Sequence, residues 1–219
     1  GIHVIDLNKT VVKLEEAAAA MKQIAKSGKK ILFVATKKQA KEIVADAVKK
    51  VNMPYMTERW PGGMLTNFAT IRKAVKKMAS IDKMSSDGTF ETISKKEKLT
   101  ISREREKLET QFGSIADMSR LPAALFIVDI SKEHIAVAEA RRLNIPTFAI
   151  VDTNSNPNLV DYPIPANDDA AKSIALIMDI VVSAIQEGLC ERKQDKDKNE
   201  DEARREGSEK LAESEASAE

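Results

Sequence analysis

Short apolar runs alternate along the chain with stretches in which apolar residues recur every three or four positions. Four runs have the length and composition of buried strands: Ile31–Ala35, Pro54–Thr57, Ala124–Asp129 and Thr147–Asp152. The stretches between them follow the helical period. Because strands and helices alternate with short connections, the pattern predicts a parallel sheet covered by helices on both faces. We therefore expect a doubly wound α/β domain of the flavodoxin-like kind.

The helix boundaries follow from capping residues and glycines. The first helix is expected to begin at Asn8 or Thr10 and to end at Gly28, after a strand-like segment from Ile2 to Leu7. The short helix before the last predicted strand is expected to be capped by Ser131. The final helix is expected to run from Asn167 to Gly188, and its apolar face is the most regular in the chain.

Residues 66–119 interrupt this alternation because they contain no strand-like run. Apolar residues recur every three or four positions before and after the turn-forming segment Ser85–Gly88. This spacing predicts an antiparallel coiled-coil hairpin that projects from the sheet domain. The sequence thus divides into a sheet domain at 1–65 and 120–190, a helical hairpin at 66–119, and a tail at 191–219. The tail is charged and lacks apolar periodicity, so we expect it to be disordered.

Charge is unevenly distributed, although the formal net charge is only +1. Residues 191–219 hold eleven acidic and seven basic side chains, which leaves a net charge of +5 on residues 1–190. A basic body with an acidic tail is compatible with a polyanionic partner. The single cysteine excludes an intrachain disulfide and a cysteine-rich metal site. We find no signal-peptide pattern and no apolar run of membrane-spanning length, and therefore expect a cytoplasmic protein.

An enzymatic function would have to reside at the carboxyl ends of the strands, where doubly wound domains bind ligands. Asp129, Asp152 and Lys37 occupy such positions and resemble the residues of phosphate- or magnesium-handling receiver domains. Capping of helices and turns explains them better, because no glycine-rich phosphate loop and no nucleophile elbow accompany them. The two histidines lack metal-ligand spacing. We expect no catalytic residue, no cofactor and no metal site.

Two groups of residues suit contact with nucleic acid. The first is the turn Arg59–Gly63, in which an arginine adjoins the only tryptophan and a Pro-Gly-Gly sequence permits close approach of the backbone. Packing of Trp60 into the base of the hairpin is an equally good interpretation. The second group is on the hairpin, whose sequence contains eleven basic and eight acidic residues. Acidic residues are sparse on its first arm around Lys73, Lys76 and Lys77.

Several segments, taken in order, resemble the bacterial S-two family of small-subunit ribosomal proteins. They cover most of residues 1–188 and include Gly1–Leu7, Phe33–Ala40, Arg59–Asn67, Lys132–Val137, Asp152–Asn154 and Asp161–Ala170. Two features differ from the family pattern: Ala35 stands where glycine is usual, and a basic amino-terminal segment of the family is not part of this sequence.

The resemblance implies a structural, non-catalytic ribonucleoprotein component that supports translation in the small ribosomal subunit. It also implies binding to small-subunit rRNA, contacts with neighbouring ribosomal proteins, and recruitment of ribosomal protein S-one near the messenger exit path. No membrane and no small-molecule substrate are implied. The residues expected to contact rRNA are Lys37, Lys38, Arg59, Trp60, Gly62, Gly63, Asn67, Arg72, Lys73, Lys76 and Lys77. The remaining alternatives are the receiver-like enzyme and a coiled-coil adaptor that binds only protein.

Overall fold

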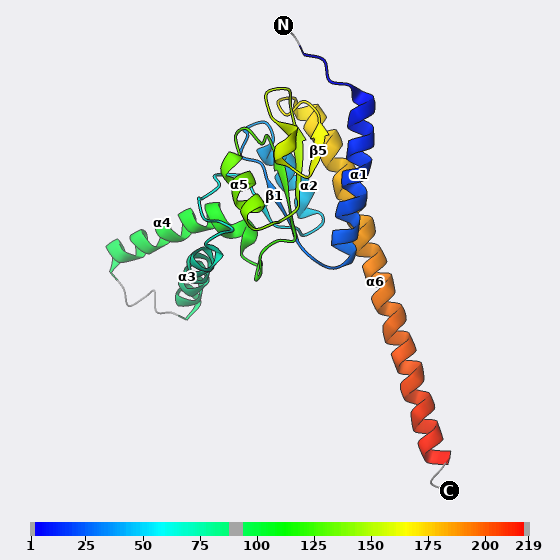
Figure 1. The fold of residues 1–219 in the computed structure, drawn as a ribbon. Helices are drawn as coiled ribbons and strands as arrows, with labels where there is room; N and C mark the ends of the chain where they lie inside the picture. The colour runs from blue at the N-terminus through cyan, green and yellow to red at the C-terminus, as the bar shows by residue number, and fades with distance from the viewer. Residues whose placement is uncertain (1–2, 88–93, 217–219) are drawn as a thin grey trace.

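A computed structural model describes residues 3–87 and 94–216 of the chain. Its centre is a parallel five-stranded sheet in the order β2-β1-β3-β4-β5 (Figure 1). The strands are β1 (Ile31–Val34), β2 (Tyr55–Met56), β3 (Ala124–Val128), β4 (Thr147–Val151) and β5 (Tyr162–Pro165). The helices are α1 (Leu7–Lys26), α2 (Lys41–Lys49), α3 (Phe68–Ser86), α4 (Lys95–Phe112), α5 (His134–Arg142) and α6 (Ala171–Ala216), with short 3-10 turns η2 (Gly113–Ile115) and η3 (Pro157–Leu159).

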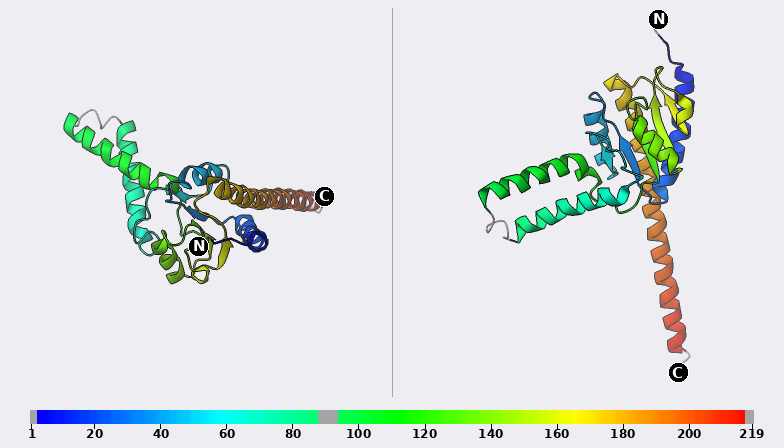
Figure 2. Two further views of the ribbon diagram at one scale, coloured as in Figure 1. Left: turned by 90° about the horizontal axis from the view of Figure 1, so that it is seen from above. Right: turned by 60° about the vertical axis from the view of Figure 1, so that its left-hand side comes forward.

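Helices cover both faces of the sheet, which confirms the doubly wound α/β class. Alternate side chains of the central strands point to opposite faces, so that Phe33 and Leu32 contribute to different cores. One core lies between the sheet and the layer formed by α1, α2 and α6. The other is closed by α5, the segment from Trp60 to Leu65 and the base of the hairpin (Figure 2).

The sequence pattern does not predict β5, the last strand of the sheet. β5 pairs in parallel with β4 through the register Ile150–Ile164. Pro163 and Pro165 obscure it in the sequence because proline lacks an N–H group, and it is tolerated here because β5 is an edge strand. The strand predicted at Ile2–Leu7 is wrong for its described residues: residues 3–6 are irregular, and Leu7 begins α1.

The helix starts differ from those predicted. Asp6 caps α1, where its side chain accepts a hydrogen bond from the Asn8 amide at 3.1 Å, whereas the sequence pattern predicts Asn8 or Thr10 as the cap. Asn167 accepts from the amides of Asp169 and Ala170 in a turn that precedes α6. The helix after β3 begins at His134 rather than just after Ser131. In each case a polar side chain organises a turn next to the helix end.

Residues 66–119 contain two helices, as expected, but a coiled-coil seam is not confirmed. Only Met78 and Ile81 on α3 and Phe112 on α4 are buried, while Phe68, Ile71, Val75 and Leu108 are partly exposed. Ion pairs join Lys77 to Glu104 and Arg105 to Asp82 along the arms. At the base, Phe112 and Ile115 join the core of the sheet domain, whereas Met78 and Ile81 are buried farther along α3 and belong to neither core. The end of the predicted turn, Gly88, lies outside the described residues.

The last helix is much longer than predicted. α6 does not end at Gly188 but continues to Ala216, where we had expected a disordered tail. Gly188 faces α1 so closely that an added Cβ would lie 2.4 Å from the carbonyl oxygen of Lys22. This glycine thus permits two helices to pack rather than ending one of them. Beyond it, Glu191 pairs with Lys22 and Lys26, at 2.8 and 3.2 Å, and Asp195 pairs with Lys26 at 3.3 Å.

The first part of α6 also corrects an expectation about hydropathy. Residues 171–198 are long and apolar enough to cross a membrane by length and composition, with a mean hydropathy of 1.6 in the most apolar window. In the fold, however, Ile174, Met178, Val181 and Ile185 are buried against the sheet and α1. The apolar composition is therefore explained by a core helix of a doubly wound domain.

The crossing of α1 and α6 yields a test of the fold. Gly188→Ala adds helix propensity worth about 1 kcal/mol, yet it places a methyl group against the backbone of α1. Because a backbone carbonyl cannot move aside cheaply, we expect a net loss of roughly 1–3 kcal/mol in the free energy of unfolding. Urea denaturation measures it.

The matched control is Gly113→Ala. There an added Cβ meets only the Glu109 side chain at 3.4 Å, an ordinary contact, so its stability should stay within about 1 kcal/mol of the parent. Equal stability of the two variants would contradict the close α1–α6 packing.

Candidate functional site

A single buried carboxylate organises the turn that the sequence singled out for nucleic-acid contact. Glu139, on the inner face of α5, is 7% exposed. Its Oε1 accepts from the Trp60 indole N–H at 3.2 Å and from the Gly63 amide at 2.7 Å. Its Oε2 accepts from the amides of Leu65 and Thr66, at 2.9 and 3.0 Å, and from the Thr66 hydroxyl at 3.1 Å. Five donors thus converge on one side chain and fix the path of residues 60–66.

The ionisation of Glu139 depends on these donors. Burial raises the pKa of the carboxyl group, but hydrogen bonds from the amides of Thr66, Leu65 and Gly63 and from the Trp60 indole outweigh burial and hold it below its usual value of 4.5. The charged form is therefore the one that the fold stabilises. The carboxylate accepts hydrogen bonds from backbone amides that, in an irregular segment, have no backbone carbonyl as their partner.

The structure places Trp60 in the core rather than on the surface. Its side chain is 5% exposed and packs with Met64, Leu65 and the hairpin base. Arg59 and Gly62 are exposed, whereas Gly63 is partly buried and adopts a φ of +86°, which favours glycine. Of the two interpretations of Trp60, packing into the hairpin base is the one observed.

The turn leads directly into α3, which carries the basic residues predicted for RNA contact. Asn67, exposed, precedes the helix and accepts a hydrogen bond from the Thr70 hydroxyl at 2.9 Å. Lys73 and Lys76 are exposed, and neither takes part in an ion pair within the part of the chain that the structure describes. Lys77 pairs with Glu104 on α4, and Arg72 donates to the backbone carbonyl of Ser119. The first arm therefore presents a basic face that is only partly neutralised.

The carboxyl edge of the sheet holds a second cluster of charges. The Lys37 ammonium lies 2.6 Å from Asp168 Oδ1, 2.7 Å from Asp169 Oδ1 and 3.4 Å from Asp129 Oδ2. Burial alone would lower the pKa of Lys37, but these carboxylates raise it above its usual value, so the ammonium stays charged. The charge of Lys37 is thus engaged within the fold and does not add to the basic face of α3. Lys38 is exposed.

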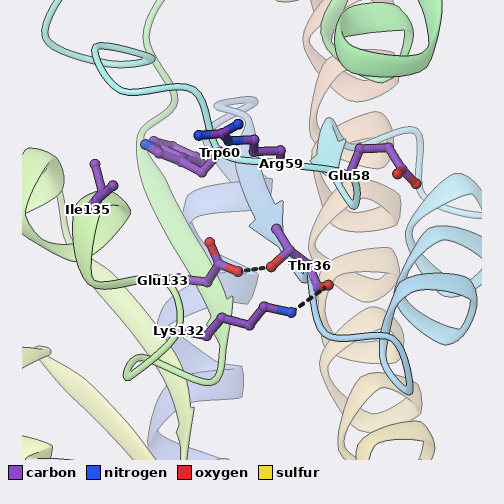
Figure 3. Close-up of a pocket in the computed structure, with 7 residues that line it drawn as sticks. All are labelled: Thr36, Glu58, Arg59, Trp60, Lys132, Glu133 and Ile135. Atoms are coloured by element: carbon purple, nitrogen blue, oxygen red, sulfur yellow. Dashed lines mark hydrogen bonds between the residues drawn. The ribbon is translucent and has the colours of Figure 1, made fainter.

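Beside this cluster, a pocket of about 340 Å³ opens at the carboxyl ends of the paired strands β1 and β3, after which the chain leads to opposite halves of the sheet. Figure 3 shows Thr36 donating to Glu133 and accepting from Lys132 at 2.9 Å, with Arg59 and Trp60 higher in the view. Burial raises the pKa of Glu133 above its usual value despite the Thr36 hydrogen bond. These contacts satisfy the polar groups internally, as expected of a structural site.

The same edge contains the residues considered for enzymatic chemistry. Asp129 adopts a φ of +66° and accepts from the amides of Ser131 and Lys132, so it caps the turn after β3, as the capping interpretation predicts. Asp152, Asp168 and Asp169 bring carboxylate oxygens within 4.8 Å of one another and could together hold a cation. Lys37 already contacts two of these three, and Asp168 Oδ2 is buried without a hydrogen-bond partner.

Glu139 is not among the residues that the sequence pattern predicts to be functional. A signal was present, because Glu139 lies between Val137 and Ala140 on the apolar face of a short helix, where a charged residue requires partners. Those partners are backbone amides more than seventy positions away, which residue types alone do not disclose.

We expect Glu139→Gln to destabilise the protein by about 2–3 kcal/mol at neutral pH. The NH₂ group of glutamine would face N–H groups, such as those of Gly63 and Leu65, that now donate to the carboxylate. Since the pKa of Glu139 is lower in the folded state, its contribution is fully present above about pH 4.5 and is lost as the pH falls through the folded value. The stability difference between parent and variant, from urea denaturation, should shrink below pH 4.5.

Glu106→Gln, at an exposed position on α4, is the control and should leave stability nearly unchanged at every pH. A Glu139→Gln variant as stable as the parent at neutral pH would show that the turn does not depend on this carboxylate.

Comparison with known proteins agrees with this structural character. The family model described as Ribosomal protein S2 matches residues 1–188. Small ribosomal subunit protein uS2 of Flavobacterium johnsoniae is 68% identical over 197 residues, 90% of this chain and 78% of that protein. The proteins of the same name from Parabacteroides distasonis and Porphyromonas gingivalis are 66% and 67% identical, with 90% and 89% of this chain and 70% and 69% of theirs covered. The family is one of structural proteins rather than enzymes, and this chain belongs to it.

Proposed function

We propose that this protein is a structural constituent of the small ribosomal subunit that binds small-subunit rRNA through its hairpin and the adjoining turn. The observation that carries the proposal is the exposed basic face of α3, held at a fixed point on the sheet domain by the turn that Glu139 organises. Membership of the S-two family supports the ribosomal role. The protein would act in the cytoplasm as part of a ribonucleoprotein during translation.

The predicted RNA-contacting residues divide into two roles in this proposal. Lys38, Arg59, Gly62, Asn67, Arg72, Lys73, Lys76 and Lys77 are at least partly exposed and form or adjoin the contact surface. Trp60 and Gly63 fix the turn from inside. Lys37 contributes to RNA contact only indirectly, because its ammonium is already paired with Asp168 and Asp169. Exposed lysine and arginine side chains suit contact with phosphates, which position a protein on RNA without reading its sequence.

The resemblance to the S-two family also suggests that the protein contacts neighbouring ribosomal proteins and helps to recruit ribosomal protein S-one near the messenger exit path. No membrane and no small-molecule substrate belong to this proposal. Small subunits reconstituted without this chain should retain less protein S-one than complete subunits. Equal retention would remove recruitment from the proposal while leaving rRNA binding untouched.

The rRNA contact of the hairpin is tested by neutralising Lys73, Lys76 and Lys77 to glutamine. Each lost phosphate contact should flatten the slope of log affinity against log salt by about 0.7–0.9, and preference among RNA sequences should not change. The measurement is a salt titration of binding to small-subunit rRNA.

The matched control neutralises Lys9, Lys49 and Lys172, three exposed lysines outside the hairpin. It removes the same charge and should keep a steeper slope than the hairpin variant. If both triple variants stay folded and show one common slope, the hairpin face is not the RNA-contacting surface.

A further inference from the structure

A basic cleft lies at the amino ends of the strands, opposite the carboxyl ends described above, and contains none of the residues expected to contact RNA. A hollow of about 500 Å³ lies at the amino ends of β1 and β3 and is lined by Gly28, Lys29, Lys30, Asp117, Met118, Ser119, Arg120, Leu121 and Ala123. It is formed by two segments distant in the sequence, the turn after α1 and the turn after η2. In Figure 1 these turns lie at the edge of the sheet from which α6 projects.

The charge of this cleft favours an anion. Lys29, Lys30 and Arg120 line it against one acidic residue, Asp117. Among the described residues, no ion pair engages any of these three cations. The guanidinium of Arg192 on α6 also lies against the cleft, because a Cβ added to Gly28 would come within 2.2 Å of Arg192 Cζ.

The cleft is held in shape by contacts within the protein. The Lys30 ammonium donates to the backbone carbonyl of Asn52 at 2.6 Å, which fixes this side chain at one wall. Gly28 has a φ of +75° that lets the chain turn sharply into β1. The Ala123 amide donates to the Lys30 carbonyl at 2.8 Å and joins the two turns. A preformed site loses little freedom when a ligand binds.

The cleft is continuous with the basic arm of the hairpin. Arg72 on α3 donates to the carbonyl of Ser119, one of the residues that line the cleft. Lys76 lies one turn further along α3, on the same side as Arg72. Cationic side chains thus follow one another from the hairpin, past Arg72, to Arg120 and Lys29.

We propose that this cleft binds the phosphate backbone of the same small-subunit rRNA that contacts α3, as a second anchoring point of the proposed rRNA-binding function. Exposed cations that take part in no ion pair among the described residues, on a concave surface, suit a polyanion, because each phosphate that they neutralise releases condensed counterions. The exposed side chain of Leu121, 43% exposed, gives the cleft an apolar wall for a ribose. The occupant is RNA backbone because the cleft adjoins the proposed RNA-contacting face through Arg72, which donates to the carbonyl of Ser119 in the cleft lining.

The test compares three variants of the full chain. Lys29→Gln with Arg120→Gln removes two cleft cations, whereas Lys9→Gln with Arg142→Gln removes two exposed cations elsewhere. Lys29→Arg with Arg120→Lys preserves the charge of the cleft. Affinity for full-length small-subunit rRNA is measured over a range of salt concentrations, and thermal unfolding checks that each variant is folded.

We expect the cleft variant to flatten the salt slope by about 1.4–1.8, corresponding to two phosphate contacts, while the charge-preserving variant keeps the parent slope. A smaller change is expected for the Lys9 and Arg142 variant. If the cleft variant binds with the parent's slope while the hairpin lysine variant loses affinity, the cleft is not an anchoring point and the proposed function stands. If the parent itself does not bind rRNA, both fail.

Discussion

The Glu139 carboxylate receives five hydrogen bonds from residues 60–66, and the position of the hairpin depends on them. Without that acceptor, the buried Leu65 amide and Trp60 indole N–H would have no partner, a state that proteins rarely tolerate. With it, an irregular segment covers one face of the sheet, buries Trp60, and delivers Thr66 to the start of α3 at a defined place. A short helix of the sheet domain thus determines where a projecting basic arm departs, and that is how the core is connected to the proposed RNA surface.

Charge is used in two distinct ways on this molecule. At the carboxyl edge of the sheet, where related architectures bind ligands, the Lys37 ammonium pairs with Asp129, Asp168 and Asp169, and its charge is engaged within the fold. On α3 and at the amino edge, Lys73, Lys76, Lys29 and Arg120 remain exposed. Paired charges have little left to offer a partner, whereas exposed unpaired charges remain available to bind one. The distribution of ion pairs therefore separates the surfaces that stabilise the fold from those proposed to meet RNA.

The strands were predictable where both faces are buried, since Ala124–Val128 and Thr147–Val151 are continuous apolar runs. β5 was not, because Pro163 and Pro165 contradict the local strand signal and only the edge position makes them acceptable. The local sequence around Gly188 indicates a helix end, yet this glycine permits close packing of α6 against α1, which the local sequence does not indicate. The basic face of the hairpin could be predicted from residue types. Glu139, the burial of Trp60 and the cleft at Lys29 and Arg120 could not, because each joins segments distant in the chain.

Contact of RNA with the α3 face and the amino-edge cleft is tested most directly by mapping lysine reactivity. Amines of the free protein and of its complex with small-subunit rRNA are acetylated under matched conditions and located by mass spectrometry. We expect Lys73, Lys76 and Lys29 to lose reactivity in the complex, whereas Lys9 and Lys172 should keep theirs. Protection of Lys9 and Lys172, with Lys73, Lys76 and Lys29 as reactive as in the free protein, would contradict it.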